Sequence, residues 1–514
     1  MAKNQHNQSI VGVLKSIHTR IQEGHGGEAR SDFLRFLRDQ FDLNTHRIHL
    51  AEVASLCRRL GEYERAIRLV RPLIDSEQSQ RTTATPDEQA QYAACLMSMG
   101  AVADGFKILE RIDAPAPPEA YLFTAFGHML RNHYDLATEP LRKFIEHPAP
   151  SQYQKLVAQT NLIQVLVYQG DTEETDKLLP ELLRTTEQGN FKLLHGNLLE
   201  SSVHQEFWRG NIAQAERRLA QAQKLHQQSG ELRRFYIKQW RAILDLKQGG
   251  ATPANQKRLK RVQQEARELA VFGIIRECDI ALAHVTQDER LWQHLLFGVP
   301  PGSQLERIQR LSGIELSVHS KYTWVPQQTP LHEAQIIIEL STGKTLPHGP
   351  SLKVGQVLHR LLNIFTNDFY RPLRVGEIHE ALFPDKFYHP RASPLAVRQA
   401  LFRLRRWFDD HELPFEIQES QGTYRLVGHS NGGLLLHAAS RLTLSPERFA
   451  ALCLVKKLQE SGELSPRKDI QTQEAAKALG VSLATARRQL KTATEAGYLH
   501  RQGAGRSTRY CLPK

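Results

Sequence analysis

Residues 8 to 315 repeat one pattern, and this repetition limits the possible fold more than any other feature of the chain. Nearly every segment there carries apolar residues at the spacing of an amphipathic helix. Small or polar turn residues recur every 32 to 40 residues, at Gly61, Gly100, Asn132, Gly170, Gly210 and Gly249. A period of this length is typical of stacked helix pairs. Each pair leaves an apolar face that only its neighbour can bury, so the pattern predicts an α-solenoid with a concave surface.

The segment Leu50 to Ile74 (LAEVASLCRRLGEYERAIRLVRPLI) shows the pattern most clearly. Its Leu60-Gly61-Glu62-Tyr63 turn and the small residue Ala66 resemble the turn and the packing residue of tetratricopeptide repeats. The concave surfaces of such solenoids bind peptides or proteins. We therefore expect residues 1–315 to be a tetratricopeptide-like α-solenoid that binds a protein or peptide. A scaffold or a homodimerisation spacer is the alternative.

A second architecture is predicted after a Pro- and Gly-containing linker at 316–332. Residues 333–428 should contain a hairpin (334–346), three helices (352–365, 375–382 and 394–409) and a closing hairpin (416–427). Ser393 should cap the third helix, with Pro394 in its first turn. The apolar face of this helix is expected to consist of Val397, Leu401, Leu404 and Phe408. Gln399, Arg403 and Arg406 then project from the opposite face.

This middle module resembles the OmpR/PhoB-type winged helix in its leading hairpin, its RLRRWF helix end and its QGTYRL wing. The resemblance implies that the third helix enters the DNA major groove. The residues that we expect to contact DNA are Arg391, Arg398, Gln399, Arg403 and Arg406. A module used for protein contact remains an alternative, because the net charge of the segment is small.

A third module is predicted at 445–514, after a linker at 429–444. A short helix (472–479) and a turn at Gly480 precede a second helix, which Ser482 can cap. The apolar face of this second helix should contain Leu483, Ala486, Leu490 and Ala493. Gly497 should end the helix, and glycines at 503 and 505 should turn a two-stranded wing. This order is helix-turn-helix geometry followed by a hairpin.

The third module resembles a bacterial winged-helix family in its helix pair (EAAKALGVSLATARRQL) and its wing (GAGRSTRY). The resemblance implies that the second helix and the wing contact DNA. The expected contact residues are Ser482, Thr485, Arg487, Arg488, Lys491, Arg501, Arg506 and Arg509. Basic residues also occur on any solvated helix face, but a glycine hairpin that carries three arginines has little packing purpose.

The distribution of charge agrees with a nucleic-acid partner at the C-terminal end. The chain has a formal net charge of +12, and residues 445–514 hold 13 Lys and Arg against 6 Asp and Glu. Residues 1–330 are nearly balanced, with 41 against 38. There is no long apolar run and no apolar leader, so we expect a cytoplasmic, nucleoid-associated protein without a membrane segment.

Catalytic, metal and cofactor sites are not expected. The five cysteines lack CxxC spacing, and the sequence has no HExxH, GxSxG or GxGxxG motif. The fold class that we expect is mainly α, an α-solenoid followed by two small α+β winged-helix domains. The two resemblances imply a bacterial transcriptional regulator that binds double-stranded DNA. The alternative is a non-enzymatic scaffold whose winged helices dock proteins.

Overall fold

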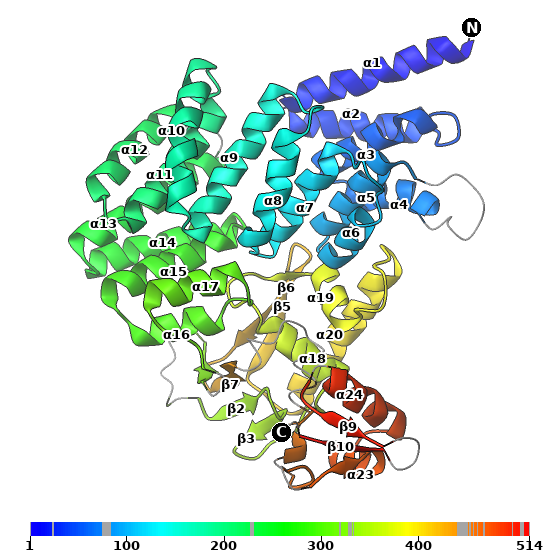
Figure 1. Cartoon of the computed structure of the whole chain (residues 1–514), viewed down its shortest axis with the longest axis vertical. Coiled ribbons are helices and arrows are strands. Elements are labelled where there is room, and N and C mark those ends of the chain that lie inside the picture. The colour runs from blue at the N-terminus through cyan, green and yellow to red at the C-terminus, as the bar shows by residue number, and fades with distance from the viewer. Residues whose placement is uncertain are drawn as a thin grey trace. The chain divides into compact units, whose positions relative to one another are not determined.

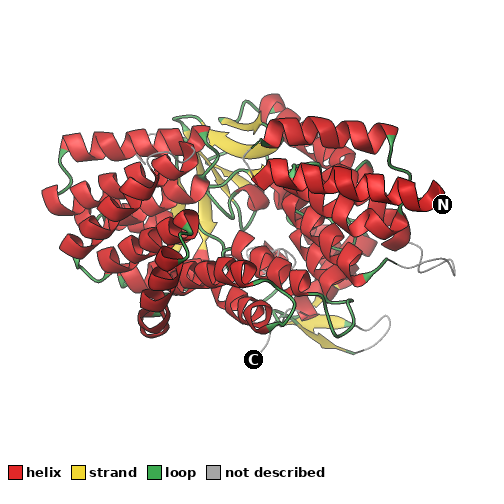
Figure 2. Cartoon of the chain, turned by 90° about the horizontal axis from the view of Figure 1, so that it is seen from above, coloured by secondary structure: helices red, strands yellow, loops and turns green. Residues whose placement is uncertain are grey.

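The structure is a computed structural model that describes most of the chain. It covers residues 2–22, 25–74, 84–226, 231–317, 320–326, 332, 334–438, 451, 454–455, 457–459, 461–465, 468–495, 497–503 and 508–512. Helices dominate this part, and its strands form three small sheets (Figures 1 and 2). The chain divides into two compact units. Unit 1 comprises Met1–Arg131, Leu136–Ala158 and Arg374–Leu395, and unit 2 comprises Asn132–Asp135, Gln159–Leu373 and Ala396–Lys514.

The expected helical repeats are present. The first helices are α1 (Ala2–Gln22), α2 (Gly26–Asp39) and the short 3-10 helix η1 (Arg47–His49). Helix pairs then follow along the chain (Figure 1): α3 (Leu50–Arg59) and α4 (Tyr63–Ile74), α5 (Pro86–Ser98) and α6 (Val102–Leu109), α7 (Pro118–Leu130) and α8 (Tyr134–Glu146), α9 (Gln152–Gln169) and α10 (Thr172–Gln188), α11 (Lys192–Trp208) and α12 (Ile212–His226), α13 (Glu231–Gly249) and α14 (Pro253–Glu268), α15 (Phe272–Thr286) and α16 (Glu289–Phe297). Helix α17 (Ser303–Ser312) closes the series.

The turns inside the pairs have the left-handed backbone that their residue types favour. Gly61 has φ 78°, Gly170 has φ 77°, and Asn132 has φ 58°. Most residues with a Cβ rarely adopt such backbone angles, whereas glycine adopts them freely and asparagine tolerates them. These two residue types therefore suit the turn between two helices. The turn expected at Gly249 lies one residue later, at Gly250 (φ 70°), because α13 extends through Gly249.

Residues 374–395 pack onto the first repeats, within unit 1. Helix α19 (Val375–Leu382) carries Glu380, whose carboxylate accepts the Ala103 backbone N–H at 2.7 Å and pairs with Arg131. The backbone N–H of Tyr388 donates to Asp104 at 2.7 Å. These residues were expected to belong to the middle module. Because of these contacts with α6 and Arg131, residues 374–395 belong to the compact unit of the first repeats instead.

Both segments expected to be linkers contain strands. Strand β1 (Lys321–Trp324) pairs antiparallel with β7 (Gly432–His437), and β7 runs parallel to β2 (Ile336–Glu339). The hairpin of β2 and β3 (Lys344–Leu346) is present as expected, so the sheet order is β1-β7-β2-β3. Leu434 and Leu436 are buried on β7, and this burial holds the segment in the sheet. The outer limits of the predicted domains remain a prediction.

The helices of the middle segment are as expected except at their starts. Helix α18 begins at Val357 and ends at Phe365, not from Leu352, because Gly355 has φ 77° and breaks the helical path. Helix α20 (Ala392–Asp410) begins before Ser393, which therefore is not its cap. The His389 ring nitrogen accepts the backbone N–H groups of Arg391 and Ala392 instead. The closing hairpin is β5 (Phe415–Ser420) and β6 (Thr423–Gly428), in a sheet of order β4-β6-β5 with β4 (Leu373–Arg374).

The C-terminal segment has its own small core. Helix α23 (Thr472–Leu479) ends at Gly480 (φ 66°), and α24 (Leu483–Glu495) follows. Strands β8 (Ile470–Gln471), β9 (His500–Gln502) and β10 (Arg509–Cys511) form an antiparallel sheet of order β8-β10-β9. The side chains in the core include Leu454, Leu458, Ile470, Leu479, Leu490 and Tyr510. The sequence Ser445-Pro446-Glu447 also predicts a helix cap at the start of this segment, and it lies outside the described residues.

Candidate functional sites: two basic helix faces and a repeat groove

The face of α20 opposite its core presents the polar residues expected there. Val397, Leu401, Leu404 and Phe408 are buried, as predicted from their spacing. Gln399 and Arg403 are exposed, and Arg406 is exposed with an ion pair of 3.3 Å to Asp410 on the next turn. The helix therefore holds Gln399, Arg403 and Arg406 on one solvent-facing stripe, four and three residues apart.

Other arginines near α20 are tied to the protein or lie at its start. Arg405 donates two hydrogen bonds to the Ile417 carbonyl, at 2.9 and 3.1 Å, and so fixes β5 to the helix. Arg398 is exposed and hydrogen-bonds Tyr424 of β6. Arg391, also exposed, lies just before the helix.

Helix α24 presents a more strongly basic face. The Ser482 hydroxyl accepts the Thr485 backbone N–H at 3.2 Å, which confirms the predicted cap. The hydroxyls of Ser482 and Thr485 also lie 2.9 Å apart. The positively charged side chains on its outer face are all exposed: Arg487, Arg488 and Lys491, the last with Glu495 at 3.5 Å.

The apolar face of α24 differs from expectation at one position. Ala486, Leu490 and Ala493 are buried, but the Leu483 side chain is 51% exposed. Leu483 occupies the first helical position, where the side chain lies beyond the edge of the small core. On another flank, the Gln489 side-chain amide donates to the Val354 carbonyl at 3.3 Å.

The wing arginines differ in their surroundings. Arg501 lies on β9 and is exposed. Arg509 of β10 donates to Asp469 at 2.6 Å, immediately before β8, so it also ties the sheet together. Arg506 lies outside the described residues.

A groove of about 440 Å³ runs across the repeats of unit 2 and is formed by α9, α11, α13 and α15. Polar side chains from successive repeats line it. Asn161 and Asn197 are 36 residues apart, as are Gln164 and Glu200. The primary amides of asparagine and glutamine offer one acceptor and two donor hydrogens, which complement the peptide backbone. Gln239 of α13 also lines the groove; it is 4% exposed, and its Oε1 has no hydrogen-bond partner among the residues that the structure describes.

The base of this groove is held by a buried ion pair. Arg307 donates from both terminal nitrogens to Glu277, at 2.7 and 2.9 Å, and both residues are less than a tenth exposed. Burial alone would raise the pKa of Glu277, but the charge and hydrogen bonds of Arg307 outweigh it, so that pKa is lowered. The His204 ring lies 3.0 Å from Arg307, and burial lowers the pKa of His204 to about 3. The groove base thus contains a matched ion pair beside a neutral imidazole.

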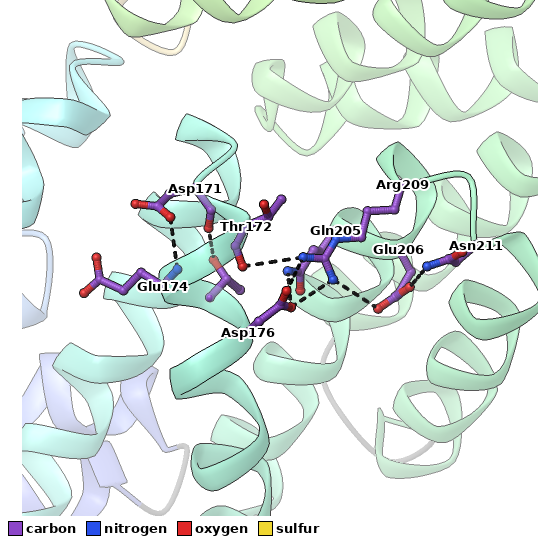
Figure 3. Close-up of polar contacts among 9 residues, drawn as sticks. Asp171, Thr172, Glu174, Asp176, Gln205, Glu206, Arg209 and Asn211 are labelled. Carbon is purple, nitrogen blue, oxygen red and sulfur yellow. Dashed lines mark hydrogen bonds and ion pairs between the residues drawn. The ribbon is translucent and has the colours of Figure 1, made fainter.

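Polar contacts also fix the repeats against one another near the α9–α10 turn (Figure 3). Arg209, which directly follows α11, donates two hydrogen bonds to the Asp176 carboxylate of α10, at 2.8 and 2.6 Å. Gln205, one turn earlier, donates to the same carboxylate at 3.1 Å. Asp171 caps α10 by accepting the Glu174 backbone N–H at 3.0 Å. These contacts join the N-terminal end of α10 to the C-terminal end of α11.

Sequence reasoning missed three features of these surfaces. Phe402 of α20 is 63% exposed, within the stripe of polar residues. Leu483 was expected inside the core, and Gln239 was not singled out. The exposure of Phe402 was predictable, because the helical spacing that places Leu401 and Leu404 on the buried face places Phe402 on the opposite face. The burial of Gln239 depends on the neighbouring repeats and has no local sequence signal.

The described residues contain neither a cluster of metal ligands nor a membrane-spanning helix. No group of three or more His, Cys, Asp or Glu side chains there is placed to hold a metal ion. No helix in the same part of the chain combines the length and apolar character needed to span a bilayer.

Comparison with known proteins gives little further guidance. No family model matches the chain, and no curated protein is significantly similar to it. Among solved structures, yeast Tom70 aligns over 95% of this chain and 90% of its own, with 8% sequence identity and a TM-score of 0.19. A likeness at that TM-score carries no argument. The assignment of helical repeats rests on the helix pairs and turns described above, and such repeats are a fold commonly used for protein interaction.

Proposed function

We propose that the protein is a sequence-specific DNA-binding transcriptional regulator whose helical-repeat groove receives a protein or peptide. One observation carries the proposal. Helix α23, the left-handed Gly480 and the capped helix α24 form a helix-turn-helix, and the three-stranded sheet supplies the hairpin of a winged helix. The outer face of α24 exposes Arg487, Arg488 and Lys491, which suit phosphate and base contacts.

In this proposal the middle segment is a second winged helix of the OmpR/PhoB type, with α20 in the major groove. Arginine pairs bidentately with guanine, and glutamine pairs with adenine. The stripe of Gln399, Arg403 and Arg406 has the residue types for such pairing. The mechanism is binding rather than catalysis, it needs no cofactor, and the site of action is the nucleoid in the cytoplasm.

The second candidate is a non-enzymatic protein-interaction scaffold whose two small modules dock proteins, a second copy of the chain among them. The observation in its favour is apolar exposure on both helix faces. Phe402 is 63% exposed on α20, and Leu483 is 51% exposed on α24. Exposed aromatic and aliphatic side chains among arginines are typical of protein interfaces. The groove serves a polypeptide partner equally well in either proposal.

Salt-titrated DNA binding by the full chain separates the two candidates. We expect the double change Arg487→Ala with Arg488→Ala to weaken binding to a mixed-sequence duplex about tenfold or more. The slope of log affinity against log salt should fall by about two, because each lost phosphate contact removes roughly one released counterion. Fluorescence anisotropy of a labelled duplex measures both quantities.

The matched control is Arg65→Ala with Arg68→Ala, which removes two exposed arginines from α4. This variant should bind DNA as the unchanged chain does. If both double variants bind alike, or if the unchanged chain shows no salt-dependent binding, the DNA proposal is wrong and the scaffold is favoured.

A separate prediction concerns the base preference of the α20 stripe, which consists of Gln399, Arg403 and Arg406. Replacing Gln399 or Arg403 with Ala should reduce discrimination at particular base pairs about tenfold, because each residue pairs with one or two bases. The exposed positions of both residues leave the fold unchanged. Selection of bound duplexes from a random pool, followed by sequencing, measures the preference of each variant. Identical selected sequences from the variants and the unchanged chain would remove α20 from base recognition.

A further inference from the structure

Unit 2 has a second cavity, of about 410 Å³, which shares only Phe272 with the lining of the repeat groove and includes no residue of α20 or α24. It lies where α14, α15 and α16 meet β1, β6 and the loop of residues 366–373. Its volume is within the range of pockets that hold small organic molecules. Segments from distant parts of the sequence build its walls, so no local pattern reveals it.

Several aromatic side chains line this cavity. Trp324 of β1 packs against Phe369, with ring centroids 6.1 Å apart, and Phe369 packs against His294 at 5.1 Å. The further aromatic lining residues are Phe272, Phe365, Tyr370 and Tyr424. Because these rings already contact one another, they form a fixed surface on which a planar ligand can stack.

The charges at the cavity are predominantly positive. Its lining residues include Arg267, Arg371 and Arg425. The Arg425 guanidinium also donates to the Gln418 side-chain oxygen, at 2.6 and 3.1 Å. Among the lining residues Asp368 is the acidic one, and Arg276 neutralises it through a buried contact of 2.8 Å. Burial lowers the pKa of His294 to about 4, with Arg290 acting in the same direction, so this ring is neutral near pH 7. An anion in the cavity would meet several cations and no uncompensated carboxylate.

We propose that this cavity binds a small anionic ligand that contains a planar aromatic ring. The ring would stack on Trp324 and Phe369, and the carboxylate, sulfonate or phosphate group would pair with Arg267 and Arg425. Guanidinium groups bind such anions through paired, charge-assisted hydrogen bonds. Because β6 lines the cavity and forms the hairpin beside α20, the ligand would contact both the last repeats and the middle segment. The inference does not depend on DNA binding.

The test uses the full chain and two fluorescent probes that share an aromatic framework. The first is the anion 8-anilinonaphthalene-1-sulfonate, and the second is the uncharged N-phenyl-1-naphthylamine. We expect saturable binding of the anion at one site, and binding of the uncharged probe at least tenfold weaker. Arg267→Gln and Arg425→Gln should each raise the dissociation constant of the anion about tenfold, and should leave that of the uncharged probe unchanged. Trp324→Phe should reduce energy transfer from tryptophan to the bound anion.

The matched control is Arg261→Gln, which removes an 83% exposed arginine from the same helix as Arg267. It should bind the anion as the unchanged chain does. Arg425 is itself exposed, so its replacement tests the proposal without threatening the fold. Equal affinity of all three arginine variants for the anion, or equal affinity of the unchanged chain for both probes, would overturn the proposal.

Discussion

Glu277→Gln should lower the free energy of unfolding by about 3 to 5 kcal/mol, because it leaves the buried Arg307 guanidinium without its counter-charge. Arg307 is 3% exposed and makes two short hydrogen bonds to the carboxylate. The neighbouring His204 cannot replace that charge, since a neutral imidazole carries none and a protonated one would repel Arg307. Urea unfolding followed by circular dichroism measures the loss.

Two further variants separate the buried charge from a general effect of substitution. Glu173→Gln breaks an exposed pair with Lys177, in which the glutamate side chain is 84% exposed, and should change stability by less than about 0.5 kcal/mol. Glu277→Gln combined with Arg307→Met removes both charges and should recover most of the loss. If Glu277→Gln lowers the free energy of unfolding as little as Glu173→Gln does, the buried pair does not stabilise the fold.

Asp279→Asn should stabilise the chain relative to the original at pH 7, and the difference should shrink by about 2 kcal/mol on going to pH 4. Burial raises the pKa of Asp279 to about 6, against hydrogen bonds from Gln263 and Tyr370 that lower it. A raised carboxyl pKa means that the folded state favours the protonated form. The stability from this proton is present below the unfolded pKa near 4 and is lost as pH rises through about 6. Asparagine is neutral throughout and avoids that loss.

The measurement is the difference between the two unfolding free energies at several pH values, not the pH dependence of either protein alone. Burial lowers the pKa of His204 to about 3, of His294 to about 4 and of His359 to about 4. These neutral rings destabilise the folded state on acidification, which opposes the effect of Asp279. The histidines are common to both proteins, so their contribution cancels in the difference. A difference that does not change with pH would place the pKa of Asp279 near its ordinary value.

The candidate surfaces could be predicted where they depend on local periodicity. Val397, Leu401, Leu404 and Phe408 are buried as their spacing requires, and this fixes which side of α20 faces solvent. The Ser482 cap of α24 was likewise local, since a hydroxyl at that position needs only the next backbone N–H groups. The same local argument predicted Ser393 as the cap of α20 and was wrong. The His389 ring nitrogen accepts the N–H groups at the start of this helix instead.

The partners of charged side chains were not predictable. Arg405 and Arg509 have the same local character as Arg403 and Arg501, yet Arg405 binds the Ile417 carbonyl and Arg509 binds Asp469. These partners are 12 and 40 residues away in sequence. Sequence spacing cannot predict which arginine has a partner within the protein, because the partner depends on which strand or turn lies beside the arginine in the fold.

The sequence by itself determined the helical repeats, because a period of paired amphipathic helices with glycine or asparagine turns has few alternatives. It also determined the helix, glycine turn and helix of the C-terminal segment. Only the tertiary structure decided that the segments around Tyr322 and Leu434 are paired strands rather than linkers, and that residues 374–395 join the first repeats. It alone assembled the cavity near Trp324 and the buried pair of Arg307 and Glu277. Local patterns fix which face of an element is apolar, whereas the partner of that face is fixed by packing among elements far apart in the chain.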